Sequence, residues 1–160
     1  SVGMSKVIVA EEMKPAIEKA FAEDNEILIE EYIKGRELTC GVFEYNDEII
    51  RLPLTEIISK KDFFDYEAKY NQTMADEITP AKISDENSKE IQDTSAKLYH
   101  LLNCKGLVRF DFIMSEDKFW FLEVNTIPGM SNESIVPQQI RAAGYTLQEF
   151  YGMIIEEALR

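Results

Sequence analysis

The chain has 160 residues, of which 45% are hydrophobic, and a formal net charge of −13. This length allows one domain of ordinary size, or two small lobes, with a hydrophobic core. The negative charge disfavours unspecific binding to nucleic acid or to an anionic membrane, because phosphate groups attract lysine and arginine, so any phosphate ligand must be held locally with the help of a metal ion.

The first 58 residues predict one helix and three antiparallel strands. Apolar residues recur at helical spacing from Glu11 to Glu23, and Pro15 is tolerated there because it falls in the first turn. Strands are expected over residues 26–33, 37–43 and 48–58. Pro53 indicates an edge or a bulge in the last of them, because proline cannot donate to the hydrogen-bond ladder. We expect the helix to pack on one face of these strands.

The end of the strand expected over 26–33 is a candidate nucleotide site. Its backbone can offer hydrogen bonds to a flat heterocycle, Tyr32 or Ile33 can cover the ring, and an acid can bind ribose hydroxyls. The acids available are Glu30, Glu31 and Glu37. The alternative interpretation is a solvated acidic rim without a ligand.

The segment 59–81 is polar and aromatic and has no sustained period. About twenty residues without regular structure is long for a compact domain, and such loops are commonly lids or binding loops. Lys69 and Tyr70 in its middle could close over a bound phosphate and exclude water. A connector without function is the alternative. A helix over 84–102 follows, with Ser84 as its N-cap.

Residues 105–126 predict a β-hairpin, because two apolar, aromatic-rich runs flank the polar break SEDK. Alternate side chains of a strand share a face, so Arg109 and Asp111 point the same way on the first strand. Glu123 and Asn125 likewise share a face on the second strand. These polar side chains stand where the pattern of both strands would otherwise place apolar residues.

The oxygen-bearing side chains of Asp111, Glu123 and Asn125 converge only if residue 111 pairs with residue 123. This pairing requires an odd number of loop residues, for example the three at 116–118, and a slip by one residue would separate the carboxylates. Two carboxylates held close together repel each other, and oxygen ligands of this kind suit Mg²⁺. Arg109, expected opposite Asn125, suggests a phosphate as the further partner of the metal. The alternative is a surface hairpin with solvated charges.

Pro128-Gly129 forces a turn after the hairpin, and a helix is expected to begin near Ser134 or Ile135. The backbone N–H groups at a helix N-terminus attract anions, so this end could bind a substrate carboxylate. Alternatively, Ser134 is only an N-cap. An amphipathic helix over 146–159 closes the chain.

Two cysteines, Cys40 and Cys104, lie far apart and match no metal-binding spacing, so we expect free thiols in a reducing cytoplasm. No apolar run approaches the roughly 20 residues of a membrane span, and no signal peptide is expected. The chain begins at Ser1 without an initiator methionine, which favours a processed product or a piece cut from a longer sequence.

Five blocks occur in one order over nearly the whole chain: SVGMSKV, IEEYIKGRELT, DFFDYEAKY, GLVRFDFI and FLEVNTIPGMSNESIVP. In this combination the sequence resembles the D-alanine–D-alanine ligase family of ATP-grasp enzymes, over about the C-terminal half of such an enzyme. The resemblance implies an α+β ATP-grasp fold of antiparallel sheets with packed helices in two lobes. Residues 1–58 would form the C-terminal part of the small ATP-binding lobe. Residues 59–160 would form the C-terminal lobe, with the lid at 59–81 and the metal-binding hairpin at 105–126.

The resemblance also implies a cytoplasmic bacterial ligase, usually a homodimer, that acts in peptidoglycan synthesis and thereby in cell-wall biogenesis and cell shape. Such an enzyme uses ATP and two Mg²⁺ ions, or Mn²⁺, to phosphorylate the carboxylate of one D-alanine. It then joins the acyl phosphate to the amine of a second D-alanine. An enzyme with D-lactate or D-serine as acceptor is one alternative. A non-catalytic acidic module that binds a metal or a protein partner is another.

Residues that match the family's motifs take on expected roles. The metal ligands would be Asp111, Glu123 and Asn125. The catalytic residues would be Arg109, which steadies the transferring phosphoryl group, Tyr70 and Ser134. The nucleotide contacts would be Glu30, Tyr32, the backbone of Ile33, Glu37 and Lys69. The second substrate's carboxylate would bind at Ser134 and Ile135. Because the family's N-terminal domain and its phosphate-binding lysines have no equivalent in these 160 residues, we expect the chain to fold but not to turn over substrate alone.

Overall fold

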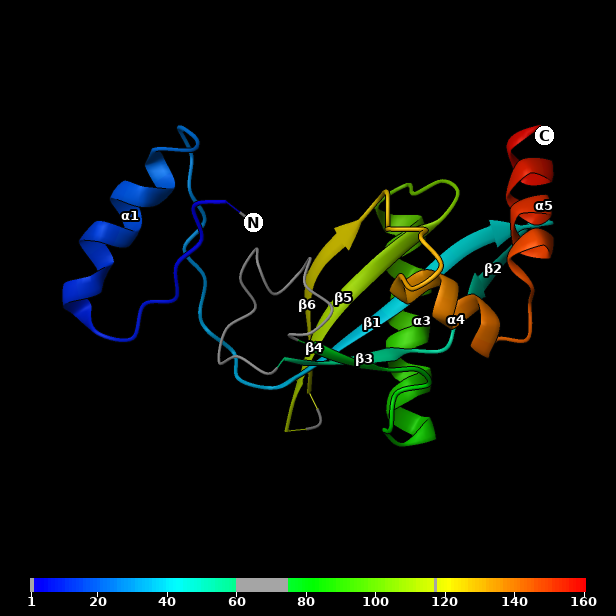
Figure 1. Cartoon of the computed structure of the whole chain (residues 1–160), viewed down its shortest axis with the longest axis horizontal. Helices are drawn as coiled ribbons and strands as arrows, with labels where there is room; N and C mark the ends of the chain where they lie inside the picture. Colours follow the sequence, from blue (N-terminus) through cyan, green and yellow to red (C-terminus); the bar gives the residue numbers. More distant parts are fainter. Residues whose placement is uncertain (1, 60–74, 117) are drawn as a thin grey trace. The chain divides into compact units, whose positions relative to one another are not determined.

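The computed structural model describes residues 2–59, 75–116 and 118–160. The chain divides into two compact units. The smaller unit comprises Ser1–Ile33 and Ser59–Asp76, and the larger comprises Lys34–Ile58 and Glu77–Arg160. Lys69 and Tyr70, the candidate lid residues, lie outside the described residues. The helices and strands are labelled in Figure 1.

An antiparallel sheet organises the larger unit. The strands are β1 (Arg36–Tyr45), β2 (Glu48–Arg51), β3 (Thr55–Ser59), β4 (Ala75–Ile78), β5 (Val108–Ser115) and β6 (Lys118–Asn125). Their order across the sheet is β4-β3-β1-β5-β6, and β2 pairs with the second half of β1. The strand expected over 48–58 is therefore two strands, β2 and β3, separated by residues 52–54. Pro53 lies in this interruption, as its missing backbone donor predicts.

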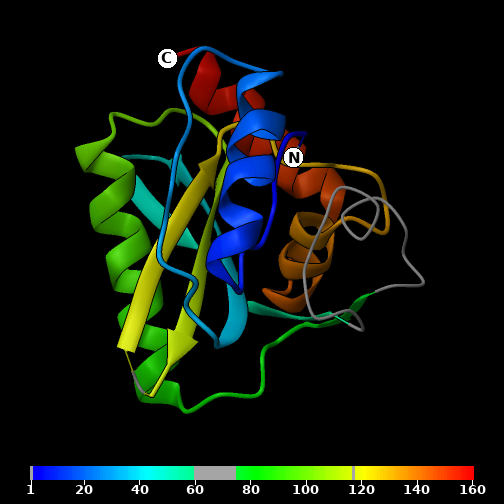
Figure 2. The same ribbon diagram turned by 90° about the vertical axis from the view of Figure 1, so that its left-hand side faces the viewer.

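Helices cover both faces of this sheet (Figure 2). Helix α3 (Asp85–Leu101) lies on one face, and α4 (Ile135–Ala142) and α5 (Leu147–Ala158) lie on the other. Ser84 caps α3 as expected, since its side chain accepts a hydrogen bond from the backbone N–H of Asn87. Within the described residues, no helix combines the length and the apolar character that crossing a membrane would need.

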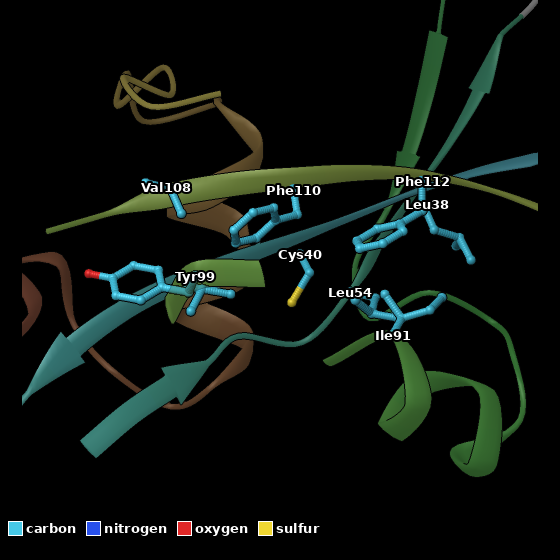
Figure 3. Packing of buried hydrophobic residues seen from close by; sticks show 9 residues of the cluster. Leu38, Cys40, Leu54, Ile91, Tyr99, Val108, Phe110 and Phe112 are labelled. Carbon is cyan, nitrogen blue, oxygen red and sulfur yellow. The ribbon is translucent and has the colours of Figure 1, made fainter. Parts of the chain in front are cut away.

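The first core lies between the sheet and α3. Figure 3 shows Phe110 and Phe112 of β5 pointing to the same side as Cys40 of β1, towards Ile91 and Tyr99 of α3. All five side chains are at most 1% exposed. These strand residues carry even numbers, so the odd-numbered residues between them face the opposite side of the sheet.

We expect the folded chain to lose stability as the pH rises above about 9, because burial raises the pKa of the Cys40 thiol to about 12 from an ordinary value of 9.0. As the pH rises, the Cys40 thiol loses its proton in the unfolded chain before it does so in the folded chain. The free energy of unfolding therefore falls by about 1.4 kcal/mol for each pH unit between those two values. Urea unfolding of the wild type and of Cys40→Ala at several pH values measures this. The wild type should lose stability more steeply, and equal pH slopes would contradict the prediction.

The second core lies between the sheet and the helices of the other face. It contains Phe43, Leu52, Val136, Ile140 and Phe150. The rings of Phe43 and Phe150 meet edge to face, with 5.1 Å between their centroids. Because Val136 and Ile140 come from α4, this core seats α4 against the second half of β1.

The smaller unit contains a 3₁₀ turn, η1 (Ala10–Glu12), and helix α1 (Met13–Phe21), which confirms the helix expected over 11–23. The strand expected over 26–33 is wrong for the described residues, where this segment has no strand assignment. A strand needs a hydrogen-bonded neighbouring strand as well as an apolar pattern, and the described residues provide no such neighbour for residues 26–33. Leu28 and Ile29 are accordingly 88% and 66% exposed.

Candidate active site

Three adjacent strands set the candidate residues in two rows on the odd-numbered face of the sheet. In one row, Asp111 of β5 pairs with Thr39 of β1 on one side and with Glu123 of β6 on the other. In the next row, Arg109 pairs with Gly41 and with Asn125. The predicted pairing of 111 with 123 and of 109 with 125 is therefore confirmed, and the two acids lie on neighbouring strands.

The loop expected between the two strands is wrong, although the pairing is right. Ser115 pairs with Lys118, so two residues connect the strands instead of three. Phe112 pairs with Phe121, and the register shifts by one residue between this pair and the pair of Asp111 with Glu123. Leu122 is the extra residue of β6 at this β-bulge, and it supplies the odd residue that the sequence predicts in the loop.

Arg109 and Asp111 form a two-pronged ion pair on β5. Nε of Arg109 donates to Oδ1 of Asp111 at 2.8 Å, and Nη2 donates to Oδ2 at 2.7 Å. The side chains are only 11% and 16% exposed. Burial alone would lower the pKa of Arg109, but the hydrogen bond and charge of Asp111, with the charges of Glu123 and Glu77, raise it. The guanidinium therefore stays charged and in a fixed orientation.

The chemistry of this donor set fits a hard divalent cation. Each carboxylate oxygen has more than one acceptor position, so Asp111 can accept from Arg109 and still offer oxygen to a metal. The Asn125 side-chain oxygen accepts a hydrogen bond from the N–H of Ile127 at 3.3 Å, which orients the amide. Among the residues that the structure describes, no group of three His, Cys, Asp or Glu forms a metal cluster, so a cation here would rely on the amide and on ligand oxygens besides the two acids.

The N-terminus of α4 begins where predicted. Ser134 holds the N-cap position and Ile135 is the first helical residue. The Ser134 hydroxyl makes no capping bond to the helix and instead lies 2.7 Å from the hydroxyl of Ser131. Ser134 is therefore the N-cap residue, as one of the two interpretations predicts, but its side chain does not cap the helix. The first-turn N–H groups are not satisfied by its side chain.

The candidate nucleotide residues fall in both units. Glu37 lies on β1 opposite Ile113, and hence on the same face as Asp111. Glu30, Tyr32 and Ile33 lie in the smaller unit, where the ammonium of Lys6 stands 3.6 Å from the centre of the Tyr32 ring. That these residues contact one nucleotide stays a prediction.

Two further residues at the site escaped the sequence analysis. Glu77 of β4 acts electrostatically on Arg109 and accepts a hydrogen bond from Gln138 of α4. Gln139 is fully buried and reaches β1. The available signal was the pair of glutamines in the apolar first turns of α4, since a buried amide must find hydrogen-bond partners.

The whole chain is similar to known proteins. The family model described as "D-ala D-ala ligase C-terminus" matches residues 1–156. The chain is 46% identical over 160 residues to a D-alanine–D-alanine ligase of Porphyromonas gingivalis, covering 99% of this chain and 48% of that protein. It is 50% identical over 157 residues to one of Azobacteroides pseudotrichonymphae, covering 98% and 48%.

Solved structures that resemble this chain include ligases of the same kind. The VanG D-Ala:D-Ser ligase of Enterococcus faecalis superposes with a TM-score of 0.86 at 35% identity, covering 96% of this chain and 45% of that one. A D-alanine–D-alanine ligase of Bacillus anthracis complexed with ATP gives 0.79 at 34% identity, covering 96% and 49%. The α+β fold is accordingly that of the ATP-grasp ligases. Within that class, the chain belongs to the D-alanine–D-alanine ligase family and spans about half the length of the relatives it matches.

Proposed function

We propose that this chain provides the C-terminal half of the active site of an ATP-dependent ligase that joins two D-alanines for peptidoglycan synthesis. The observation that carries the proposal is the arrangement of Asp111 and Glu123 as direct cross-strand neighbours beside the fixed guanidinium of Arg109. One matching relative was solved as a complex with ATP, which supports ATP as the phosphoryl donor.

In this proposal the carboxylate of the first D-alanine attacks the γ-phosphorus of ATP and ADP leaves, which produces an acyl phosphate. The amine of the second D-alanine then attacks the acyl carbon, and phosphate leaves. Arg109 holds a positive charge next to the oxygens on which negative charge accumulates, and its pair with Asp111 fixes its direction beforehand. Two Mg²⁺ ions, or Mn²⁺, held by Asp111, Glu123 and Asn125 would supply charge neutralisation on the phosphates.

The other residues receive proposed roles in the same reaction. The adenosine contacts are Glu30, Tyr32, the backbone of Ile33, and Glu37. Lys69 and Tyr70 would close on the phosphates. Ser134 and Ile135, at the start of α4, would bind the carboxylate of the second substrate, since helix N-termini attract anions. The cytoplasmic location and the homodimer belong to the same proposal.

A ligase with a different acceptor is the second candidate. The superposition on a protein titled as a D-Ala:D-Ser ligase favours it. That enzyme and the D-alanine–D-alanine ligases share the fold over this chain. The second substrate, and not the phosphoryl transfer, distinguishes the two candidates.

The test joins this chain, in place of the C-terminal half, to the first half of the Porphyromonas gingivalis relative. With ATP and Mg²⁺, we expect this fusion to release ADP only when D-alanine is present, and mass spectrometry should detect D-alanyl-D-alanine. The 160-residue chain alone should release none. If the fusion is given D-alanine and D-serine together and the main product contains D-serine, the second candidate would be favoured. An inactive fusion that folds, or D-alanine-dependent turnover by the chain alone, would contradict the proposal.

A further inference from the structure

A gap in the sheet lies next to the candidate site. On one side of β1, β3 pairs with residues 37–39 and β2 pairs with residues 42–45. Between them the chain leaves the ladder at residues 52–54, where the N–H of Leu52 donates to the carbonyl of Gly41 at 2.9 Å. The strands therefore leave the N–H of Gly41 and the carbonyl of Thr39 to find partners elsewhere.

The side chain of Gln139 fills this gap. Its Oε1 accepts from the N–H of Gly41 at 3.0 Å, and its Nε2 donates to the carbonyl of Thr39 at 2.9 Å. The Gln139 amide thus takes the place of a backbone peptide group in the ladder. Gln139 is fully buried, so these hydrogen bonds have no competition from water.

Gly41 makes this contact possible because it has no side chain. A Cβ at this position would lie 2.7 Å from Oε1 of Gln139 and 2.8 Å from Cδ1 of Leu52. Gly41 is also the residue that pairs directly with Arg109 across the β1–β5 ladder. The helix that carries Gln139 is therefore attached to the sheet at the row that contains Arg109.

We propose that Gln139 is a positioning residue that sets the N-terminus of α4 relative to Arg109. Gln139 lies four residues after Ile135, about 6 Å along the helix axis. A helix held by two buried hydrogen bonds at this point cannot tilt its first turn away from the sheet without breaking them. The inference rests on the proposed function: the group positioned by Gln139 is the carboxylate of the second substrate, which binds at Ser134 and Ile135.

Gln92 provides a matched control. This glutamine of α3 donates through Nε2 to the carbonyl of Leu52 at 2.9 Å, so it serves the same gap from the opposite face of the sheet. Its loss should disturb the gap and lower stability without releasing α4. A purely structural role for Gln139 would make the two substitutions equivalent.

The kinetic test compares Gln139→Met and Gln92→Met in the fusion described above. We expect Gln139→Met to raise the KM for the second amino acid by about tenfold or more, with the KM for ATP changed less than about twofold. Gly41→Ala should give the same pattern, because its Cβ displaces the Gln139 amide. Gln92→Met should leave the ratio of the two KM values unchanged. Equal effects of the two glutamine substitutions on that ratio would overturn the inference.

A second measurement does not require activity. In the 160-residue chain, Gln139→Met should make amide hydrogen exchange faster at Gly41 and at Gln138. The N–H of Gln138 donates to the carbonyl of Ser134 and closes the first turn of α4. Gln92→Met should leave both amides protected. Unchanged protection of the turn in Gln139→Met would also overturn the inference. An inactive unaltered fusion would instead count against the proposed function, while the exchange measurement would still decide whether Gln139 holds the helix.

Discussion

Asp111→Asn and Glu123→Gln, each introduced into the active fusion, are expected to lower kcat by roughly 100- to 1000-fold at saturating Mg²⁺. Both amides keep the size and hydrogen-bonding capacity of the acids but remove the negative charge that attracts a divalent cation. Because the two acids are direct neighbours across β5 and β6, each variant should also raise the Mg²⁺ concentration needed for half-maximal rate. Steady-state kinetics with Mg²⁺ titrations measure both effects.

Asp93→Asn is the control for this prediction. Asp93 accepts a hydrogen bond from Arg51 at 2.6 Å in a pair that is about 40% exposed, and it belongs to α3 on the other face of the sheet. Such exposed pairs contribute at most about 1 kcal/mol to stability, so kinetics should not change. If Asp111→Asn and Glu123→Gln behaved like Asp93→Asn, the hairpin would not be the metal site, and the interpretation of solvated hairpin charges would be favoured.

Arg109→Met is expected to destabilise the 160-residue chain by about 3–5 kcal/mol in the absence of divalent cations. The substitution leaves the carboxylate of Asp111, whose side chain is 16% exposed, without its two hydrogen bonds and opposite a second acid. Mg²⁺ should restore part of this stability, because a cation between Asp111 and Glu123 replaces the missing positive charge. Urea unfolding with EDTA and with Mg²⁺ measures the loss and its recovery.

Two comparisons make this result specific. Adding Asp111→Asn to Arg109→Met should recover stability in EDTA, because the unpaired buried charge is removed. Arg36→Met breaks a similar pair, in which Nε of Arg36 donates to Glu56 at 2.7 Å, but the Arg36 side chain is 40% exposed. The Glu56 carboxylate that remains is nonetheless only 10% exposed, so the loss of stability there should be comparable. It should not respond to Mg²⁺, because the partner of Glu56 on β1 is Leu38 and not a second acid. A Mg²⁺ effect on Arg109→Met no larger than that on the wild type would contradict a shared cation.

Side-chain alternation was sufficient to predict which residues of the hairpin share a face. A strand places every second side chain on one side, so Arg109 and Asp111 had to lie together wherever the hairpin packed. The requirement that the two acids converge then predicted the pairing of 111 with 123, which the structure has. The loop length could not be predicted in the same way, because a bulge at Leu122 and a longer loop have the same effect on register.

Other elements depended on partners that are distant in the sequence. Residues 26–33 have the apolar pattern of a strand, but a strand forms only where another backbone supplies hydrogen bonds. Among the described residues, no strand pairs with this segment. The role of Gln139 could not be predicted from the local sequence either. Its partners, Gly41 and Thr39, lie about a hundred positions earlier, and the gap that it fills arises only when β2 and β3 pair separately with β1.

The sequence by itself therefore determined the class of fold, the hairpin, the face that carries its charges and the family, because periodicity and motif spacing are local properties of the chain. Tertiary structure alone decided how the site is held together. The bulge that aligns Asp111 with Glu123, the burial that fixes Arg109, and the attachment of α4 through Gln139 all arise from contacts between separate elements. Such contacts follow from packing and hydrogen-bond satisfaction in three dimensions, which no local pattern records.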